Sequence, residues 1–186
     1  QAAMAARFHL ESDAQWLYLR FVGRDYRVSR TSGAVEWTED GFATAHEAGY
    51  NDAMTIYDVL CNSKADCRAA GTYRNMSALS GIQGGAVSGS GSMLQGTVRW
   101  LDGHRDRIAG ACERLGGMPD ARGDIGYRLP MFDFLDVILR FWEADEDFPA
   151  SLDIMVDDNM LDFMHYETVW FAIIHLLERV REEMER

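Results

Sequence analysis

Four carboxylates stand within five residues of one another in the sequence, at Glu143, Asp145, Glu146 and Asp147. Carboxylates this close raise one another's pKa, as a general acid–base pair requires, and they offer the oxygen ligands that divalent cations prefer. A turn rich in Asp and Glu is, however, more often simply hydrated. The cluster therefore predicts either a solvated connection or the centre of a metal-dependent hydrolase or transferase.

A second set of metal-ligand types, Asp158, Asp162 and His165, follows at spacings of four and three residues. On a short helix these positions share one face, and together with the first cluster they would form a hard or mixed-ligand metal site. The alternative is a polar outer face with an aspartate at the N-cap. The three cysteines lack the paired spacing of a zinc site, and their odd number favours reduced thiols in a cytosol.

A third candidate is the Gly/Ser-rich loop 81–96, GIQGGAVSGSGSMLQG. It has neither the dinucleotide fingerprint nor the lysine of a Walker loop, but a Gly-rich loop that leads into a helix can bind an anion through its backbone N–H groups. The alternative is a mobile linker. The sequence does not identify a cofactor, and the candidate ligand-binding residues are Trp142, Glu143, Asp145, Glu146, Asp147, Phe148, Gly89 and Gly91.

The acidic cluster lies between two apolar runs, 137–142 and 152–156, which predict a β-hairpin at the centre of a sheet. We expect Phe148 to be buried beneath the acidic connection and to anchor it. Alternating residues near Phe8 and over 16–22, with further strands near 26–28 and 35–37, predict an N-terminal meander. Pro130 places the strand over 127–134 at an edge or a bulge.

Besides a short helix that includes Met160, Leu161 and Met164, three helices are expected from apolar residues at helical spacing. The first follows a capping box at Thr44 and Glu47, and the second begins at Thr97 and continues to Leu115. The third runs from Tyr166 to the C-terminus and is apolar almost all round in its first turns. Because Phe171 and His175 lie outside its main stripe, we expect this helix to form a homodimer contact.

Together these elements predict a single α+β domain over residues 1–186, with a mostly antiparallel sheet and helices packed largely on one face. The net charge of −12 argues against nucleic acid and against acidic membrane surfaces as partners. No apolar run approaches the ~18 residues that span a bilayer, and the start of the chain lacks the apolar core of a signal peptide. We therefore expect a cytoplasmic protein.

The central stretch FWEADEDFPASLDIMVDD resembles the bacterial and archaeal family called domain of unknown function 3786. The resemblance covers about two thirds of the chain; it extends loosely to YDVL at 57–60 and to the segment Gly71–Gly81. The family pattern is a Leu-Pro, a strand ending in Trp-Glu, an acidic pair, Phe-Pro and a strand ending in Asp, here Leu129–Pro130, Trp142–Glu143, Asp145–Glu146, Phe148–Pro149 and Asp157.

Two departures from the family pattern are visible, since Ala144 replaces an expected glycine and the four-cysteine iron–sulfur module of many members is missing. The resemblance implies a link to corrinoid or one-carbon chemistry in an anaerobe, and it implies no catalytic residue. We expect a non-catalytic ligand-binding or accessory protein, with a tetrapyrrole among the ligands considered. A metal-dependent enzyme and a protein–protein interaction module are the alternatives.

Overall fold

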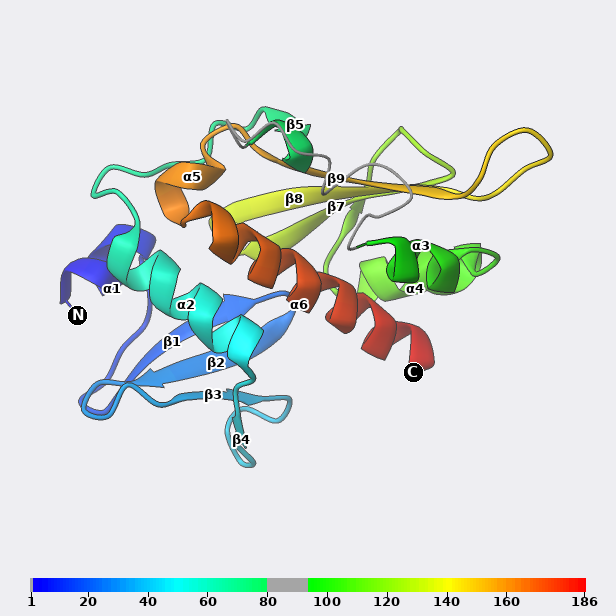
Figure 1. The fold of residues 1–186 in the computed structure, drawn as a ribbon. Coiled ribbons are helices and arrows are strands. Elements are labelled where there is room, and N and C mark those ends of the chain that lie inside the picture. Colours follow the sequence, from blue (N-terminus) through cyan, green and yellow to red (C-terminus); the bar gives the residue numbers. More distant parts are fainter. Residues whose placement is uncertain (1, 80–93) are drawn as a thin grey trace.

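The computed structural model describes residues 2–79 and 94–186. It confirms the α+β class, because a nine-stranded antiparallel sheet packs against helices (Figure 1). The strand order is β4-β3-β2-β1-β7-β8-β9-β5, and β6 pairs with β7 outside this path. The sheet has two parts, an N-terminal meander and a set of longer strands that includes the predicted hairpin.

The meander comprises β1 (Trp16–Phe21), β2 (Arg24–Ser29), β3 (Val35–Thr38) and β4 (His46–Glu47), and the first three confirm the predicted strands. Val22 and Gly23 form the two-residue turn between β1 and β2, with φ angles of 45° and 71°. Both angles are positive, as in the turns that favour tight hairpins. Val22 also donates its N–H to the carbonyl of Met131, which ties the turn to the second part of the sheet.

The second part contains β7 (Ile125–Phe132), β8 (Leu135–Trp142) and β9 (Ser151–Asp157), with β5 (Tyr73–Asn75) at its edge and the short β6 (Met118–Pro119) against β7. The predicted hairpin is confirmed, since β8 pairs with β9 from Val137–Val156 to Trp142–Ser151. The hairpin lies toward one edge of the sheet rather than at its centre. A register shift after Pro130 confirms the expected bulge.

The two parts of the sheet meet at one residue pair, Phe21 opposite Phe132. Aromatic rings strengthen this junction: Phe132 stacks on Phe21 at a centroid distance of 4.6 Å, and Phe21 stacks on His175 at 4.8 Å. On the other side Phe134 stacks on Phe132 at 5.1 Å and on Phe8 at 4.2 Å. Five nearly parallel rings therefore join α1, the β7–β8 turn, β1 and α6 where the backbone ladder is weakest.

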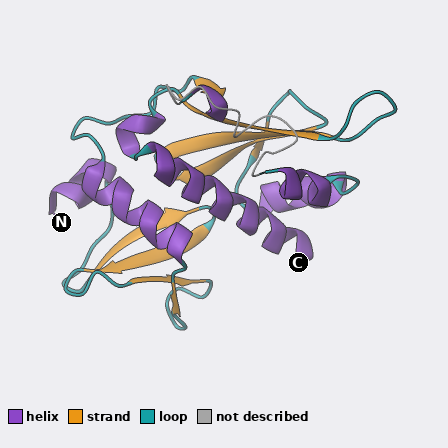
Figure 2. Ribbon diagram, in the orientation of Figure 1, coloured by secondary structure: helices purple, strands orange, loops and turns teal. Residues whose placement is uncertain are grey.

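The helices are α1 (Ala2–Phe8), α2 (Tyr50–Asn62), α3 (Gln95–Leu101), α4 (Arg105–Arg114), α5 (Met160–Phe163) and α6 (Tyr166–Glu185), with a 3-10 turn at Met76–Ala78. The long helix α6 runs across the junction of the sheet, and α2 lies beside it (Figure 2). Among the described residues no helix is long and apolar enough to cross a membrane.

Several local expectations are wrong. Residues up to Phe8 form a helix rather than a strand, because a run of alanines favours helix. Glu47 belongs to β4, so the capping box does not form, and Gly49 occupies the N-cap of α2. The helix expected from Thr97 is divided between α3 and α4 at Gly103, whose φ of 76° is incompatible with a helix.

The C-terminal helix also differs from its prediction. His175 is only 6% exposed and lies in the core between Phe21 and Tyr26, so it offers no dimer surface. Phe171 is half-buried and meets the exposed Tyr50 of α2 edge-on at 5.5 Å. Part of the apolar surface expected to contact a second copy is therefore covered by the chain itself.

Candidate functional site

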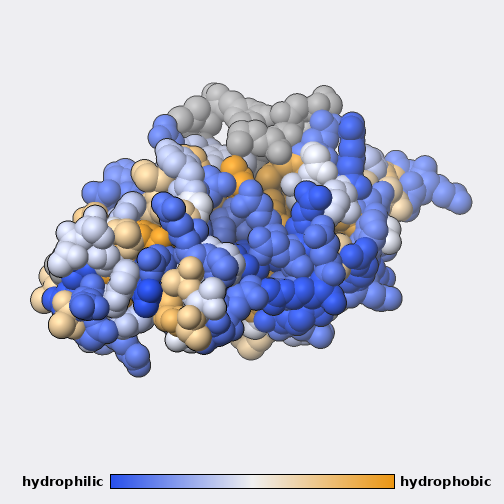
Figure 3. All heavy atoms as spheres, turned by 90° about the horizontal axis from the view of Figure 1, so that it is seen from below, coloured by the Kyte–Doolittle hydropathy of each residue, from blue (hydrophilic) through white to orange (hydrophobic). Residues whose placement is uncertain are grey.

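The acidic connection between β8 and β9 extends away from the body of the molecule (Figure 1). The space-filling view from below shows the same projection, with hydrophilic residues at its tip (Figure 3). Asp145, Glu146 and Asp147 are exposed, whereas Trp142 and Glu143 at its base are half-buried.

The prediction that Phe148 is a buried anchor is wrong, since its side chain is 71% exposed. The turn is held instead by the carboxylate of Asp145, which accepts the N–H groups of Asp147 and Phe148 at 2.9 and 2.7 Å. This Asx-type turn supports its own backbone beyond the end of the sheet. Phe148 therefore contributes no core packing.

The predicted metal site at Asp158, Asp162 and His165 is not formed. Each side chain pairs with a different residue: Asp158 with Arg74, Asp162 with Lys64, and His165 with Asp58. The helix α5 ends at Phe163 and Met164 is extended, so the three positions do not share a helical face. Among the residues that the structure describes, no group of three His, Cys, Asp or Glu side chains could hold a metal. Gly89 and Gly91 lie outside those residues.

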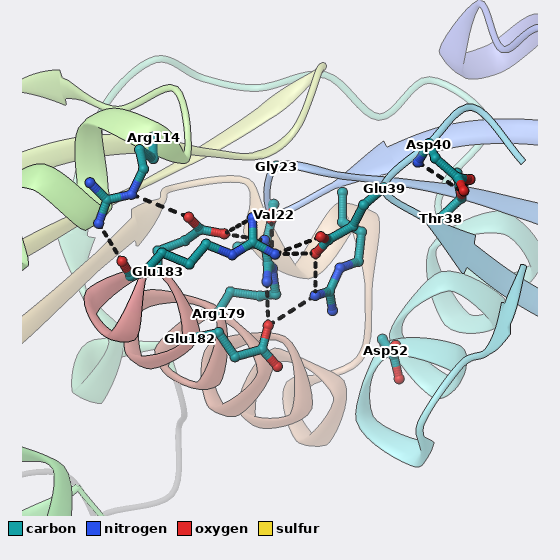
Figure 4. A network of polar contacts seen from close by, with 12 residues as sticks. Val22, Gly23, Thr38, Glu39, Asp40, Asp52, Arg114, Arg179, Glu182 and Glu183 are labelled. Carbon is teal, nitrogen blue, oxygen red and sulfur yellow. Dashed lines mark hydrogen bonds and ion pairs between the residues drawn. The ribbon is translucent and has the colours of Figure 1, made fainter. Parts of the chain in front are cut away.

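A network of ion pairs, which we call the charged clasp, joins the end of α6 to the meander (Figure 4). Arg24 binds Glu39 at 3.1 Å and Glu182 at 2.9 Å. On α6, Arg179 binds Glu182 and Glu183, and both Arg179 and Glu183 are almost fully buried. The clasp consists of Arg24, Glu39, Arg114, Arg179, Glu182, Glu183 and Arg186.

An open pocket of about 490 Å³ lies beside the clasp, but its acidic and arginine side chains form ion pairs or hydrogen bonds within the chain, and its histidine, His46, stacks on Trp37 at 4.4 Å. Hydrogen bonds from Arg186 and Arg24 lower the pKa of Glu39, and those from Thr44 and Thr38 lower the pKa of Asp40 to about 2. The Nε of Arg24 is buried and has no hydrogen-bond partner among the described residues. The guanidinium stacks on Trp37 at 3.7 Å, and this contact helps to offset the cost of burying that Nε. These contacts indicate a structural role.

Three buried polar side chains form a chain of hydrogen bonds beneath α6. The hydroxyl of Tyr26 lies 3.0 Å from the carboxylate of Asp52 and 3.2 Å from Nε2 of His175. Burial raises the pKa of Tyr26, and burial together with Arg179 and Arg24 lowers the pKa of His175 to about 3. The chain resembles a catalytic relay in composition only, because all three residues are less than 9% exposed and the hydroxyl of Tyr26 is already engaged with both Asp52 and His175.

A larger open pocket, about 690 Å³ in volume, lies between the N-terminal segment, the outer part of the meander and the β7–β8 turn. We call it the aromatic pocket, since aromatic rings from five separate segments line it. Its volume lies within the range of small-molecule sites. The residues that line it are Phe8, His9, Leu10, Glu11, Tyr18, Leu19, Arg20, Asp25, Tyr26, Gly41, Phe42, Asp133 and Phe134.

Two residues of this wall have unusual backbone conformations. His9 has a φ of 53° and Phe42 a φ of 67°, in the left-handed region that non-glycine residues seldom adopt. The hydroxyl of Thr38 accepts the N–H groups of Phe42 and Asp40 at 3.0 and 3.1 Å, and this turn holds the Phe42 ring near Tyr18. Such strained positions are concentrated at binding sites in proteins, because the surrounding structure must maintain them.

The charged side chains of the aromatic pocket are paired less completely than those of the clasp. Arg20 binds Asp25 and the carbonyl of Gly23, both at 3.0 Å. Glu11 and Asp133 also line the pocket, and the structure gives neither carboxylate a hydrogen-bond or ion-pair partner among the described residues. Charges at the rim are therefore available to a ligand.

Sequence reasoning missed this pocket. Its aromatic residues come from segments near positions 8, 18, 26, 42 and 134, which share no spacing or motif. One signal was present, because Tyr18 lies on the outward side of an alternating strand, where polar residues are expected. The sequence-based prediction favoured the acidic cluster because its carboxylates are neighbours in the sequence.

The chain was also compared with known proteins. A family model described as "Domain of unknown function (DUF3786)" matches residues 1–179. No curated protein and no solved structure matches the chain.

Proposed function

Because the chain belongs to the DUF3786 family, whose function is unknown, its role must be argued from its own residues, and we propose that it is a non-catalytic ligand-binding protein. The ligand would occupy the aromatic pocket. The observation that carries this proposal is an open pocket of about 690 Å³ whose walls are aromatic and whose backbone is strained at two positions. A planar, largely apolar molecule suits such walls.

In the described part of the chain the candidate catalytic groups are not assembled into an accessible site, which supports binding over catalysis. The exposed acidic connection brings no second functional group to its carboxylates among the described residues, and Asp52, Tyr26 and His175 are buried. The aromatic pocket itself contains one histidine, His9, without a hydrogen-bond partner in the described part of the chain. A metal-dependent hydrolase or transferase thus has less support than a binding protein, and the link to corrinoid or one-carbon chemistry stays a proposal.

An NMR titration with a neutral aromatic alcohol, 2-naphthalenemethanol, tests the proposal. We expect saturable amide shifts confined to residues of the aromatic pocket. Tyr18→Ala should weaken binding at least about tenfold, since one aromatic wall is lost. Phe148→Ala, which removes an exposed ring far from the pocket, is the matched control and should leave the affinity unchanged. Shifts that do not saturate, or that spread evenly over the surface, would exclude a ligand site here.

A second candidate function, an interaction surface, is favoured by the exposed apolar side chains of α2 beside α6. Tyr50 is 68% exposed and Met54 is 37% exposed on the same side of α2, and Tyr50 packs against Phe171. We propose that this surface forms a homodimer contact, and light scattering tests it directly. A dimer at tens of micromolar that Tyr50→Glu converts to soluble monomer supports the contact, whereas a monomeric wild-type protein excludes it.

A further inference from the structure

We propose that the ligand of the aromatic pocket carries a positive charge, as an amine or quaternary ammonium attached to a flat apolar group. This inference rests on the proposed function and specifies the class of ligand. It is drawn from the distribution of charge around the pocket and from the kind of surface that forms its walls.

The charged residues of the pocket favour a cation over an anion. One arginine, Arg20, stands against three carboxylates, Glu11, Asp25 and Asp133. Arg20 is occupied by Asp25 and by the Gly23 carbonyl, so an anionic ligand would have to displace an existing ion pair. Glu11 and Asp133, in contrast, have no partner among the described residues and can pair with an incoming cation.

The walls favour a cation for a second reason. The face of an aromatic ring is negative and attracts ammonium and guanidinium groups. One ring of these walls already binds a cation within the fold, because the guanidinium of Arg27 lies 4.6 Å from the ring centre of Phe42 and 4.0 Å from that of Trp16, which is outside the pocket. Phe42 is also part of the pocket wall, beside Tyr18.

The pocket beside the charged clasp is the obvious competitor, since it is lined by four carboxylates, Glu39, Asp40, Glu182 and Glu185. Each of these has a partner in the chain: Glu39 and Glu182 bind arginines of the clasp, Asp40 binds Thr38 and Thr44, and Glu185 binds Arg181. A cation there would compete with groups held in place by the fold. The aromatic pocket does not impose that competition.

Three probes with the same ring system separate the charge of the ligand from its shape. They are (2-naphthylmethyl)trimethylammonium, the neutral 2-naphthalenemethanol and 2-naphthalenesulfonate, each titrated while amide shifts of the pocket residues are followed. We expect the ammonium to bind at least about fivefold more tightly than the alcohol, and the sulfonate more weakly than both. The preference should decrease with added salt.

The double variant Glu11→Gln with Asp133→Asn should bring the three affinities within about twofold of one another. Asp145→Asn with Asp147→Asn is the matched control, because it removes the same two charges from the distant acidic connection and should preserve the preference. This control separates the local effect from the net charge of −12.

The outcomes distinguish this inference from the proposed function. If the alcohol binds in the pocket but the ammonium binds no more tightly, the charge inference is wrong and the proposed function stands. The charge inference is also wrong if the preference for the ammonium persists in Glu11→Gln with Asp133→Asn, or if Asp145→Asn with Asp147→Asn removes it equally. If no probe gives a saturable shift in the pocket, the proposed function fails, and the charge inference fails with it.

Discussion

Two pockets of comparable size open on the described part of this molecule, and different types of side chain line them. The pocket of about 490 Å³ beside the charged clasp is lined mostly by charged groups that pair with one another. The aromatic pocket of about 690 Å³ is lined by rings, with strained backbone at His9 and Phe42 and with two carboxylates that have no partner among the described residues. A dense group of charges can thus stabilise the fold, while a sparser group beside apolar walls is free to bind a ligand.

The largest effect should come from the clasp. Arg179 is 3% exposed and pairs with Glu183, which is also 3% exposed as a residue. Arg179→Met keeps an apolar stem but leaves Glu183 with weaker partners, so we expect a loss of about 3 kcal/mol in the free energy of unfolding. Arg181→Met, which breaks an exposed pair with Glu185 on the same helix, should cost less than about 0.5 kcal/mol. Equal losses in urea melts would contradict the structural role of the clasp.

Removing a ring of the aromatic pocket should affect stability and binding together. Phe134 is half-buried and stacks on both Phe8 and Phe132. Phe134→Ala should therefore cost about 2–3 kcal/mol in urea melts, near the lower end for a buried phenylalanine, and abolish probe binding. Phe148→Ala should change the free energy of unfolding by less than about 0.5 kcal/mol, because that ring is 71% exposed. A large loss from Phe148→Ala would mean that the acidic connection is packed after all.

Acid should destabilise the fold through His175. Burial lowers the pKa of His175 to about 3, and the neighbouring charges of Arg179 and Arg24 contribute to this shift. The unfolded chain takes up this proton near pH 6.5 and the folded chain does not, so stability is lost as the pH falls from about 6.5 toward about 3. The slope contributed is at most about 1.4 kcal/mol per pH unit. His175→Gln retains a donor for Tyr26 without titrating, so its unfolding free energy should fall less steeply with pH. Parallel curves for both proteins would contradict a neutral, buried His175.

The net change in stability at Phe42 should be small, because two opposing effects nearly cancel. Glycine adopts the φ of 67° without strain, so Phe42→Gly gains about 1 kcal/mol from the backbone and loses a comparable amount from the missing ring. The free energy of unfolding should stay within about 1 kcal/mol of the wild-type value, while probe binding weakens at least about tenfold. Probe binding at full strength would show that the strained residue serves the turn alone.

The fold was predictable from the sequence to the extent that its signals are local. The alternation over 16–22 and the two apolar runs around the acidic cluster gave the meander and the β8–β9 hairpin, and Pro130 gave the bulge. Local signals failed at Thr44 and Glu47, where strand pairing with β3 prevails over a capping box. They also failed at His175, because the aromatic stack that buries it joins residues more than 100 positions apart.

The candidate site was less predictable for the same reason. Contiguous carboxylates at 143–147 are visible in a sequence, but their surroundings are not, and the structure places most of them in solvent. The aromatic pocket arises only when α1, β1, the loop at Phe42 and the β7–β8 turn come together. The resemblance predicted the family of the chain correctly. It could not indicate this pocket, because the family is described only as a domain of unknown function.

Native mass spectrometry of the protein, purified gently from its own cells, would show whether the aromatic pocket holds a ligand. We predict one non-covalent small molecule on the wild-type chain, lost from Tyr18→Ala and from Phe42→Gly and retained by Phe148→Ala. A bound molecule that survives both pocket variants, or that leaves when the acidic connection is altered by Asp145→Asn with Asp147→Asn, would contradict a ligand in the aromatic pocket.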